Sequence, residues 1–306
     1  MSITLIAVVV VVLAGWRFPA LVRWRRLEGP WRHWQRLGRR IGARGDGWAA
    51  VSWVLLPGLL ALLLQGWLGG HGRALLLPWG VLMLFLCWGP RDLDADAAAL
   101  AEAEDDEALR AAARGLGLSA QPSGSAAVVE ALFRAGLARW FAPLFWFMVL
   151  GGAGAMLYRS VWLAGAGEPR RGSVLHTLLQ WMHLPVAGLM TLSLAMVANF
   201  DAVLGAWRDW RSRPAADRPG GPLGFLDAAA RSSVQCELQD QIEEDAERAE
   251  DAAASAESLA GVVAPPSDAV VPTMQTAVED GMALLWRMLL LWIAALALAV
   301  LGGLAG

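Results

Sequence analysis

Long apolar blocks, separated by segments that hold nearly all the charge, constrain this chain more than any other feature of its sequence. One block contains five consecutive valines at 8–12, and another, 288–303, has no charged residue. About 20 consecutive apolar residues suffice to cross a bilayer as an α-helix. The sequence therefore predicts an all-α fold: a polytopic membrane protein with about six transmembrane helices and further helical segments in the cytoplasm.

The expected spans follow from the limits of these blocks. They are 3–16 extended to 22, 48–69, 74–89, 140–158, 178–200 and 288–303. The first is expected to be retained, because no positive charge precedes it as in a signal peptide. The short turn 70–73 predicts an antiparallel hairpin of the second and third spans. Small residues at 151–155 predict close approach of another helix to the fourth.

Arginine sets the expected orientation, since all 25 basic residues are Arg. With the N-terminus outside, 20 of them fall in three cytoplasmic segments and 4 in external loops, while Arg287 lies at a membrane edge. The positive-inside rule favours this topology, with both termini periplasmic. The resulting regions are 1–89 (three spans and the basic, Trp-rich cytoplasmic loop 17–47), 90–139 (cytoplasmic), 140–206 (membrane core), 207–281 (cytoplasmic, with an acidic stretch) and 282–306 (the last span).

Several classes of function are disfavoured by composition. Without any Lys, a Walker A phosphate loop, a Schiff-base lysine and a Ser-Lys catalytic pair are impossible. Cys87 and Cys236 are too few for a disulfide framework or a zinc site. The basic, Trp-bearing segment suits anionic lipid headgroups better than nucleic acid, because it is tethered between spans. The expected partner is the lipid bilayer.

The chain contains an acidic triplet, Asp92, Asp94 and Asp96, whose alternating spacing is typical of a cation site. An EF-hand would need Gly and Glu where the chain has Ala97 and Ala103, so that interpretation fails. A looser Mg²⁺ contact stays open, although an acidic helix start is the favoured interpretation.

Two other polar sets lie in or beside the fifth span. His176 and His183 are seven residues apart and share a helix face, which suits a proton relay or a metal but more often a structural role. Asn199 and Asp201 either receive a ligand or cap that end of the helix, and the cap is favoured.

Glu130 is expected to form an ion pair with Arg134, four residues later.

Several motifs occur in order along the chain. They are Gly89-Pro-Arg91-Asp92-Leu, Phe141-Ala-Pro143-Leu-Phe145-Trp146-Phe, Gly151-Gly152, Tyr158-Arg159, Gln180-Trp181, Val197-Ala-Asn199-Phe200 and Leu285-Trp286-Arg287. Together they resemble the AmpE family, inner-membrane signalling modulators linked to β-lactamase induction. The resemblance is best over 126–201, and the acidic stretch after Ser232 has no counterpart in it. It implies a location in a bacterial inner membrane.

The AmpE family is in turn similar to the adenosylcobinamide-phosphate synthases of the CobD/CbiB superfamily. Glu130 matches the first Glu of their motif, and 142–146 match its Ala-Pro-Leu-Phe-Trp. The superfamily's remaining polar positions are occupied here by Arg134, Ala135, Trp162 and Gln180. Because ATP-dependent amide formation needs acids to hold Mg²⁺ and position the amine, the departures imply no catalytic residue, no metal and no cofactor.

The first hypothesis is therefore a non-catalytic regulator of the AmpE type, which modulates β-lactamase induction in connection with cell-wall recycling. Its implied protein partner belongs to cell-wall recycling or signalling. A retained ligand site would lie at Asp92, Glu130, Trp146 and Arg159, around the cytoplasmic mouth of the third and fourth helices, although the expected topology puts Arg159 outside. The alternatives are a residual amide-forming or nucleotide-using enzyme and a small-solute carrier.

Overall fold

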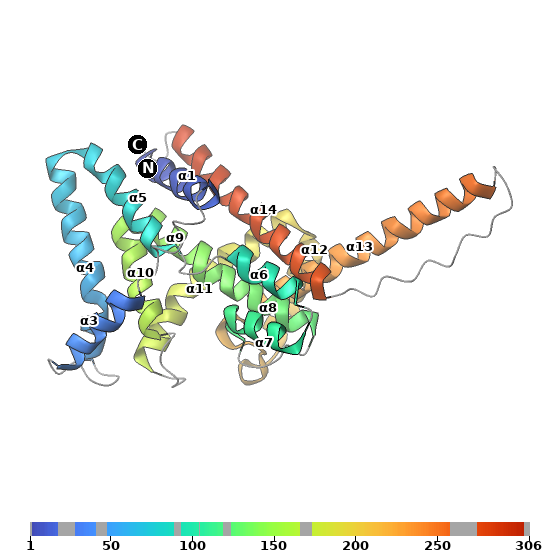
Figure 1. Ribbon diagram of the computed structural model, residues 1–306, viewed down its shortest axis with the longest axis horizontal. Coiled ribbons are helices and arrows are strands. Elements are labelled where there is room, and N and C mark those ends of the chain that lie inside the picture. Colours follow the sequence, from blue (N-terminus) through green and yellow to red (C-terminus); the bar gives the residue numbers. More distant parts are fainter. Residues whose placement is uncertain are drawn as a thin grey trace. The chain divides into compact units, whose positions relative to one another are not determined.

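The computed structural model describes residues 2–17, 28–40, 48–88, 93–103, 105–118, 124–165, 173–257 and 274–302. Helices make up nearly all of this part of the chain, and it contains no strand (Figure 1). The prediction of an all-α fold is confirmed.

The long helices follow in chain order. They are α1 (Ser2–Arg17), α3 (Glu28–Arg40), α4 (Trp48–His71), α5 (Leu76–Cys87), α6 (Leu93–Ala101), α7 (Asp106–Gly115), α8 (Ser125–Gly136), α9 (Ala142–Leu150), α10 (Gly152–Gly165), α11 (Val174–Val197), α12 (Phe200–Ser212), α13 (Gly224–Glu257) and α14 (Met274–Leu301). A π-helical turn, Leu137–Phe141, joins α8 to α9, and short 3-10 turns lie at Arg73–Leu75, Ala215–Asp217 and Gly221–Leu223.

The chain folds into two compact units, which are described separately. Unit 1 comprises Met1–Ala95, Arg134–Met190 and Trp286–Gly306, and unit 2 comprises Asp96–Phe133 and Thr191–Leu285. Unit 2 therefore draws on both of the polar regions expected in the cytoplasm. Its acidic stretch is part of α13, a helix of 34 residues, whereas Pro265, Pro266 and Pro272 lie outside the described residues.

Three helices are long and apolar enough to cross a membrane. They contain Ala50–His71, Val174–Val197 and Met274–Leu301. The apolar stretches Thr4–Leu13 in α1 and Leu76–Cys87 in α5 are shorter, so the described residues hold fewer full-length spans than the six expected. The last helix also begins earlier than predicted: α14 starts at Met274, and Arg287 lies near its middle rather than at its entrance.

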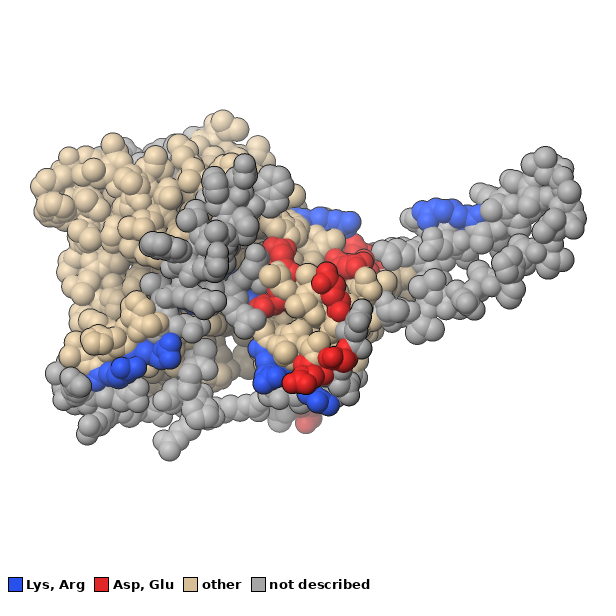
Figure 2. Space-filling model, in the orientation of Figure 1, with Lys and Arg blue, Asp and Glu red and all other residues tan. Residues whose placement is uncertain are grey.

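Large apolar side chains face outward on α4. Leu62, Leu63, Leu64 and Trp67 are between 42% and 71% exposed. A contiguous apolar face of this kind is expected where lipid replaces water. In Figure 2 the same side of unit 1 is tan, and the charged residues at its edge are the blue side chains of α3. The surface of α4 thus agrees with a membrane-embedded helix.

The expected fourth span is not one helix. The chain reverses at Gly151, whose φ of 68° lies in the left-handed region that glycine adopts without strain. A Cβ built on Gly154 would lie 2.1 Å from the Trp146 carbonyl oxygen, so α10 folds back against α9. The predicted span at 140–158 is therefore wrong, and a helical hairpin takes its place. The predicted close approach at the small residues is confirmed.

The tip of this hairpin is held by Gln65 of α4. The Gln65 Nε2 group donates to the Leu150 carbonyl oxygen (3.0 Å), and its Oε1 accepts from the Ala153 backbone N–H (3.1 Å). One side chain thereby satisfies the last carbonyl of α9 and an N–H group of α10, both of which lack partners within their own helices.

Helix α10 packs between α4 and α5, which diverge from the turn that joins them (Figure 1). Ala153 contacts Gln65, and Leu157 lies against Gly58, so α10 runs antiparallel to α4. Its C-terminal end therefore lies at the Trp48 end of α4. The sequence placed 159–177 outside and 17–47 in the cytoplasm, yet both of these segments have residues at this end of α4. The two expectations cannot both hold, because a reversing hairpin returns the chain to the side it came from.

Candidate functional site

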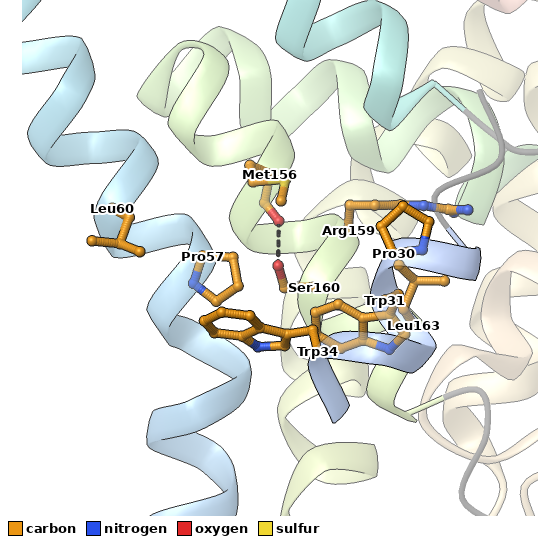
Figure 3. A pocket seen from close by; sticks show the side chains of 9 residues that line it. All are labelled: Pro30, Trp31, Trp34, Pro57, Leu60, Met156, Arg159, Ser160 and Leu163. Atoms are coloured by element: carbon orange, nitrogen blue, oxygen red, sulfur yellow. Dashed lines mark hydrogen bonds between the residues drawn. The ribbon is translucent and has the colours of Figure 1, made fainter. Parts of the chain in front are cut away.

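An apolar pocket of about 340 Å³ lies between α3, α4 and α10 (Figure 3). It is lined by Pro30, Trp31 and Trp34 of α3, Pro57 and Leu60 of α4, and Met156, Arg159, Ser160 and Leu163 of α10. Its volume is within the range of about 300–1,000 Å³ that is usual for small-molecule sites. Leu60 is 51% exposed, so one wall of the pocket continues into the outward-facing apolar surface of α4.

Paired tryptophans dock α3 on α4. The rings of Trp34 and Trp53 stack with centroids 4.3 Å apart and planes 12° apart. Each indole N–H donates to the other residue's carbonyl oxygen, at 3.3 Å from Trp34 and 3.1 Å from Trp53. A Cβ on Gly38 would lie 2.3 Å from the Trp53 Nε1, so this contact needs a glycine. The reciprocal contacts of Trp34 and Trp53 therefore fix the position of α3, which forms one wall of the pocket.

Three polar groups border the pocket. Arg159 is 1% exposed, and its guanidinium carbon lies 4.2 Å from the centroid of the Trp162 ring, a cation–π contact. The Ser160 hydroxyl donates to the Met156 carbonyl oxygen (2.9 Å). The indole N–H of Trp31, a side chain only 7% exposed, has no hydrogen-bond partner among the described residues. An acceptor on a bound molecule would satisfy it.

Next to Arg159 on α10, Tyr158 forms a buried polar pair with His183 of α11. The Tyr158 hydroxyl donates to the Ala138 carbonyl oxygen (3.0 Å) and lies 2.9 Å from the His183 Nε2. Since the hydroxyl hydrogen is used on Ala138, we assign the proton of the His183 ring to Nε2, where it donates to the hydroxyl oxygen. This pair ties the hairpin to α11.

The two histidines of α11 engage different groups. The His176 Nε2 lies 3.1 Å from the Gln180 amide nitrogen, while His183 faces Tyr158. The described residues contain no group of three His, Cys, Asp or Glu side chains that could hold a metal ion. The favoured structural interpretation of the histidines agrees with these contacts.

The structure divides the predicted site residues. Trp146 and Arg159 lie on the two arms of the hairpin, and the Trp146 Nε1 donates to the Met182 carbonyl oxygen (3.3 Å). Glu130 belongs to unit 2, and Asp92 lies outside the described residues. Glu130 forms its ion pair with Arg231 of α13. The expected pairing with Arg134 is therefore wrong. Because Arg231 is 101 residues from Glu130, local spacing could not indicate this contact.

The other acidic and capping candidates have structural contacts. The Asp94 Oδ1 accepts from the Trp286 Nε1 (2.8 Å), and Asp96 is buried in unit 2. The Asn199 Oδ1 accepts from the Ala202 backbone N–H (3.1 Å) and caps α12. Asn199 is a helix cap, as expected, but it caps the start of α12 and not the end of the fifth span, because α11 ends at Val197 and a new helix begins at Phe200.

Sequence reasoning missed the pocket itself. It assigned Trp31 and Trp34 to a headgroup-facing segment but found no partner for either residue. Their spacing of three residues, which places both on one helix face, was the available signal. No such signal pointed to Trp53, Gly38 or Gln65, because the contacts of these residues depend on how separate helices meet.

Comparison with known proteins identifies no relative: no family model, no curated protein and no solved structure matches this chain. Its site must therefore be interpreted from its own residues.

Proposed function

We propose that this chain is a multi-pass protein of a bacterial inner membrane with a non-catalytic, regulatory role of the AmpE type. In that role it modulates β-lactamase induction in connection with cell-wall recycling, together with a protein of that pathway. The membrane part is supported by three long apolar helices and by the outward-facing leucines of α4. The signalling part is supported by the motif resemblance.

The contact between Glu130 and Arg231 carries the non-catalytic part of the proposal. Glu130 is the acid that best matches the synthase superfamily, and a catalytic acid would have to face a nucleotide, a metal or an amine. Here the Arg231 guanidinium donates to its Oε1, and both side chains are about one-third exposed. A carboxylate committed to an arginine on a packed helix acts as a structural link between α8 and α13.

The hairpin modifies the proposed topology. With α3 at the cytoplasmic face, where its Arg side chains meet anionic headgroups, the hairpin of α9 and α10 enters and leaves from that same face. Helix α11 then starts on the cytoplasmic side and leads into 207–281, which is cytoplasmic as well, so it does not cross the bilayer. The spanning helices of this proposal are the four helices α1, α4, α5 and α14. Arg170 and Arg171, which follow α10 in the sequence, move to the cytoplasmic side, which strengthens the positive-inside bias. Both termini stay periplasmic in this proposal.

Cysteine labelling tests this topology. With Cys87→Ser as background, Gly167→Cys and the native Cys236 should react with an impermeant thiol reagent only after the inner membrane is opened. Ala74→Cys, exposed in the turn between α4 and α5, should react in cells whose outer membrane alone is permeable. Reaction of Gly167→Cys in those cells would refute the re-entrant hairpin.

The regulatory role is tested by deleting the gene and measuring induced β-lactamase activity and muropeptide pools. We expect deletion to change induction, and a plasmid copy to restore it. A Glu130→Arg, Arg231→Glu exchange should restore induction as well as the wild type does, because it rebuilds the ion pair. If the exchange variant is present at wild-type level but inactive, Glu130 acts as more than a structural link. Unchanged induction on deletion would refute the role itself.

A further inference from the structure

The pocket between α3, α4 and α10 combines an apolar interior with cationic surroundings. Its walls are formed mainly by Trp31, Trp34, Leu60 and Leu163. Arg159 of α10, which is 1% exposed, borders the pocket, whereas the exposed Arg32 and Arg36 lie on the opposite face of α3 from Trp31 and Trp34. In Figure 2, blue side chains of α3 adjoin the tan surface of unit 1. An apolar space bordered by a buried arginine suits a ligand that has a hydrocarbon chain and a negative charge.

The open side of the pocket indicates where such a ligand would come from. Leu60, one of its walls, belongs to the outward-facing apolar surface of α4 together with Leu59 and Leu63. A molecule that enters past Leu60 would come from the hydrocarbon layer and not from water. A water-soluble ligand would have to cross an apolar entrance, so a constituent of the bilayer fits better.

The indole N–H of Trp31 supplies the third observation. This donor is buried and has no partner among the described residues, although a buried N–H without an acceptor is costly. A lipid ester carbonyl or phosphate oxygen lies between the acyl chain and the charged headgroup, as Trp31 lies between the apolar pocket and the exposed side of α3.

We propose that this pocket is a binding site for an anionic phospholipid of the bilayer. One acyl chain lies against Leu60, Leu163 and Trp34, an ester carbonyl or phosphate oxygen accepts from the Trp31 N–H, and the negative charge of the headgroup faces Arg159. This site is independent of the proposed role in β-lactamase induction. The lipid would fix α3 against α4 and α10 at the membrane surface.

Native mass spectrometry of the purified full-length chain tests this site. The protein is exchanged into micelles that contain either dioleoyl-phosphatidylglycerol or dioleoyl-phosphatidylcholine, which differ in headgroup charge but not in acyl chains. We expect one retained phosphatidylglycerol and little retained phosphatidylcholine. Equal retention of the two lipids would overturn the proposal, as would preferential retention of oleate when it is offered alongside phosphatidylglycerol.

Two variants locate the bound lipid. Trp31→Phe removes the N–H but keeps an aromatic ring, and we expect the retained fraction to fall about fivefold, as for the loss of one net hydrogen bond. Trp67→Phe is the matched control, because Trp67 is 58% exposed on α4 and does not line the pocket. Leu163→Trp should fill the pocket and abolish retention.

Thermal unfolding of each variant identifies any failure to fold. If Leu163→Trp unfolds at a lower temperature than the wild type, the lipid site is tested only by comparing the lipid retained by Trp31→Phe with that retained by Trp67→Phe. If a folded Trp31→Phe retains as much phosphatidylglycerol as Trp67→Phe, the proposal is overturned.

Discussion

Unit 1 and unit 2 both bury leucines and phenylalanines and both have close contacts at glycines, but they differ in their polar links. In unit 1 these links include tryptophan and glutamine side chains that bind backbone groups of other helices, whereas unit 2 contains the ion pair of Glu130 with Arg231. In unit 1, Gly154 admits the backbone of α9, Gly38 admits Trp53, and Trp34 stacks on Trp53. Leu132, Phe133 and Leu226 of unit 2 are fully buried, as are Leu137, Phe141 and Leu144 of unit 1. Within a bilayer lipid chains are as apolar as leucine, so close packing, not burial, must favour association.

Side-chain caps occur at helix starts in both units. In unit 2, Asp105 caps α7 and Asn199 caps α12 with side-chain oxygens. In unit 1, the Ser173 hydroxyl caps α11 by accepting from the His176 backbone N–H (3.1 Å), whereas α5 and α9 continue from preceding helical turns and begin without a side-chain cap. A polar cap is useful where a helix starts beside water. The two units therefore share their apolar packing and their caps, and differ in the polar side chains that link their helices.

The largest expected effect tests the close packing of unit 1. Gly154→Leu would place side-chain atoms where the Trp146 carbonyl oxygen now lies, so the hairpin could not close. We expect a loss of about 3 kcal/mol or more, seen as a low yield of monodisperse protein and an early thermal transition. Gly188→Leu is the control, because a Cβ there meets nothing within 4 Å. Equal behaviour of the two variants would contradict the hairpin.

The next largest effect is expected at a polar link inside unit 1. Gln65→Leu removes both hydrogen bonds at the tip of the hairpin and leaves the Leu150 carbonyl and the Ala153 N–H without that partner. We expect a loss of about 2 kcal/mol in the free energy of unfolding. Gln235→Leu, at an exposed position of α13, should have little effect. No difference between these variants would show that packing alone holds the hairpin.

The third prediction concerns the polar margin of unit 2. Glu130→Ala leaves Arg231 without this ion pair, and we expect a loss of about 1.5 kcal/mol, as for a charge-assisted hydrogen bond. The Tm, followed by circular dichroism, should recover in the Glu130→Arg, Arg231→Glu exchange. Glu107→Ala, at an exposed position of α7, should leave the Tm unchanged. Failure of the exchange would contradict a purely structural link.

The smallest expected effect concerns a helix cap. Asn199→Ala should cost about 1 kcal/mol, because the Ala202 N–H loses its acceptor at the start of α12. Asn199→Asp should keep the Tm near that of the wild type, since aspartate caps as well as asparagine. A Tm that falls equally in both variants would mean that Asn199 acts through its amide nitrogen and not as a cap.

Much of the fold was predictable because it rests on local patterns. Uninterrupted apolar runs indicated α4, most of α11 and the C-terminal half of α14, and the polarity before Phe200 indicated a cap at Asn199. The hairpin was not predictable, since 140–158 reads as one apolar helix with a few glycines. Only the contact of Gly154 with α9 and the hydrogen bonds of Gln65 show that the chain reverses there.

The candidate site was predictable in part. Among the residues expected at a site, Arg159 of α10 lines the pocket and Trp146 of α9 does not, while Trp31 and Trp34 were expected to face lipid headgroups. Their common setting was not visible, because the pocket draws on α3, α4 and α10, which are far apart in the sequence. Glu130 shows the same limit, since its partner Arg231 is 101 residues away.

The sequence by itself determined that this chain is helical and suited to a membrane, because hydropathy over 20 residues depends only on the residues in that window. It also determined which segments are polar. The tertiary structure alone decided that the fourth apolar block turns back at Gly151, that α10 packs between α4 and α5, and that α3 closes a pocket over Arg159. These features depend on which surfaces meet, and a contact between distant residues leaves no periodic signal in a single sequence.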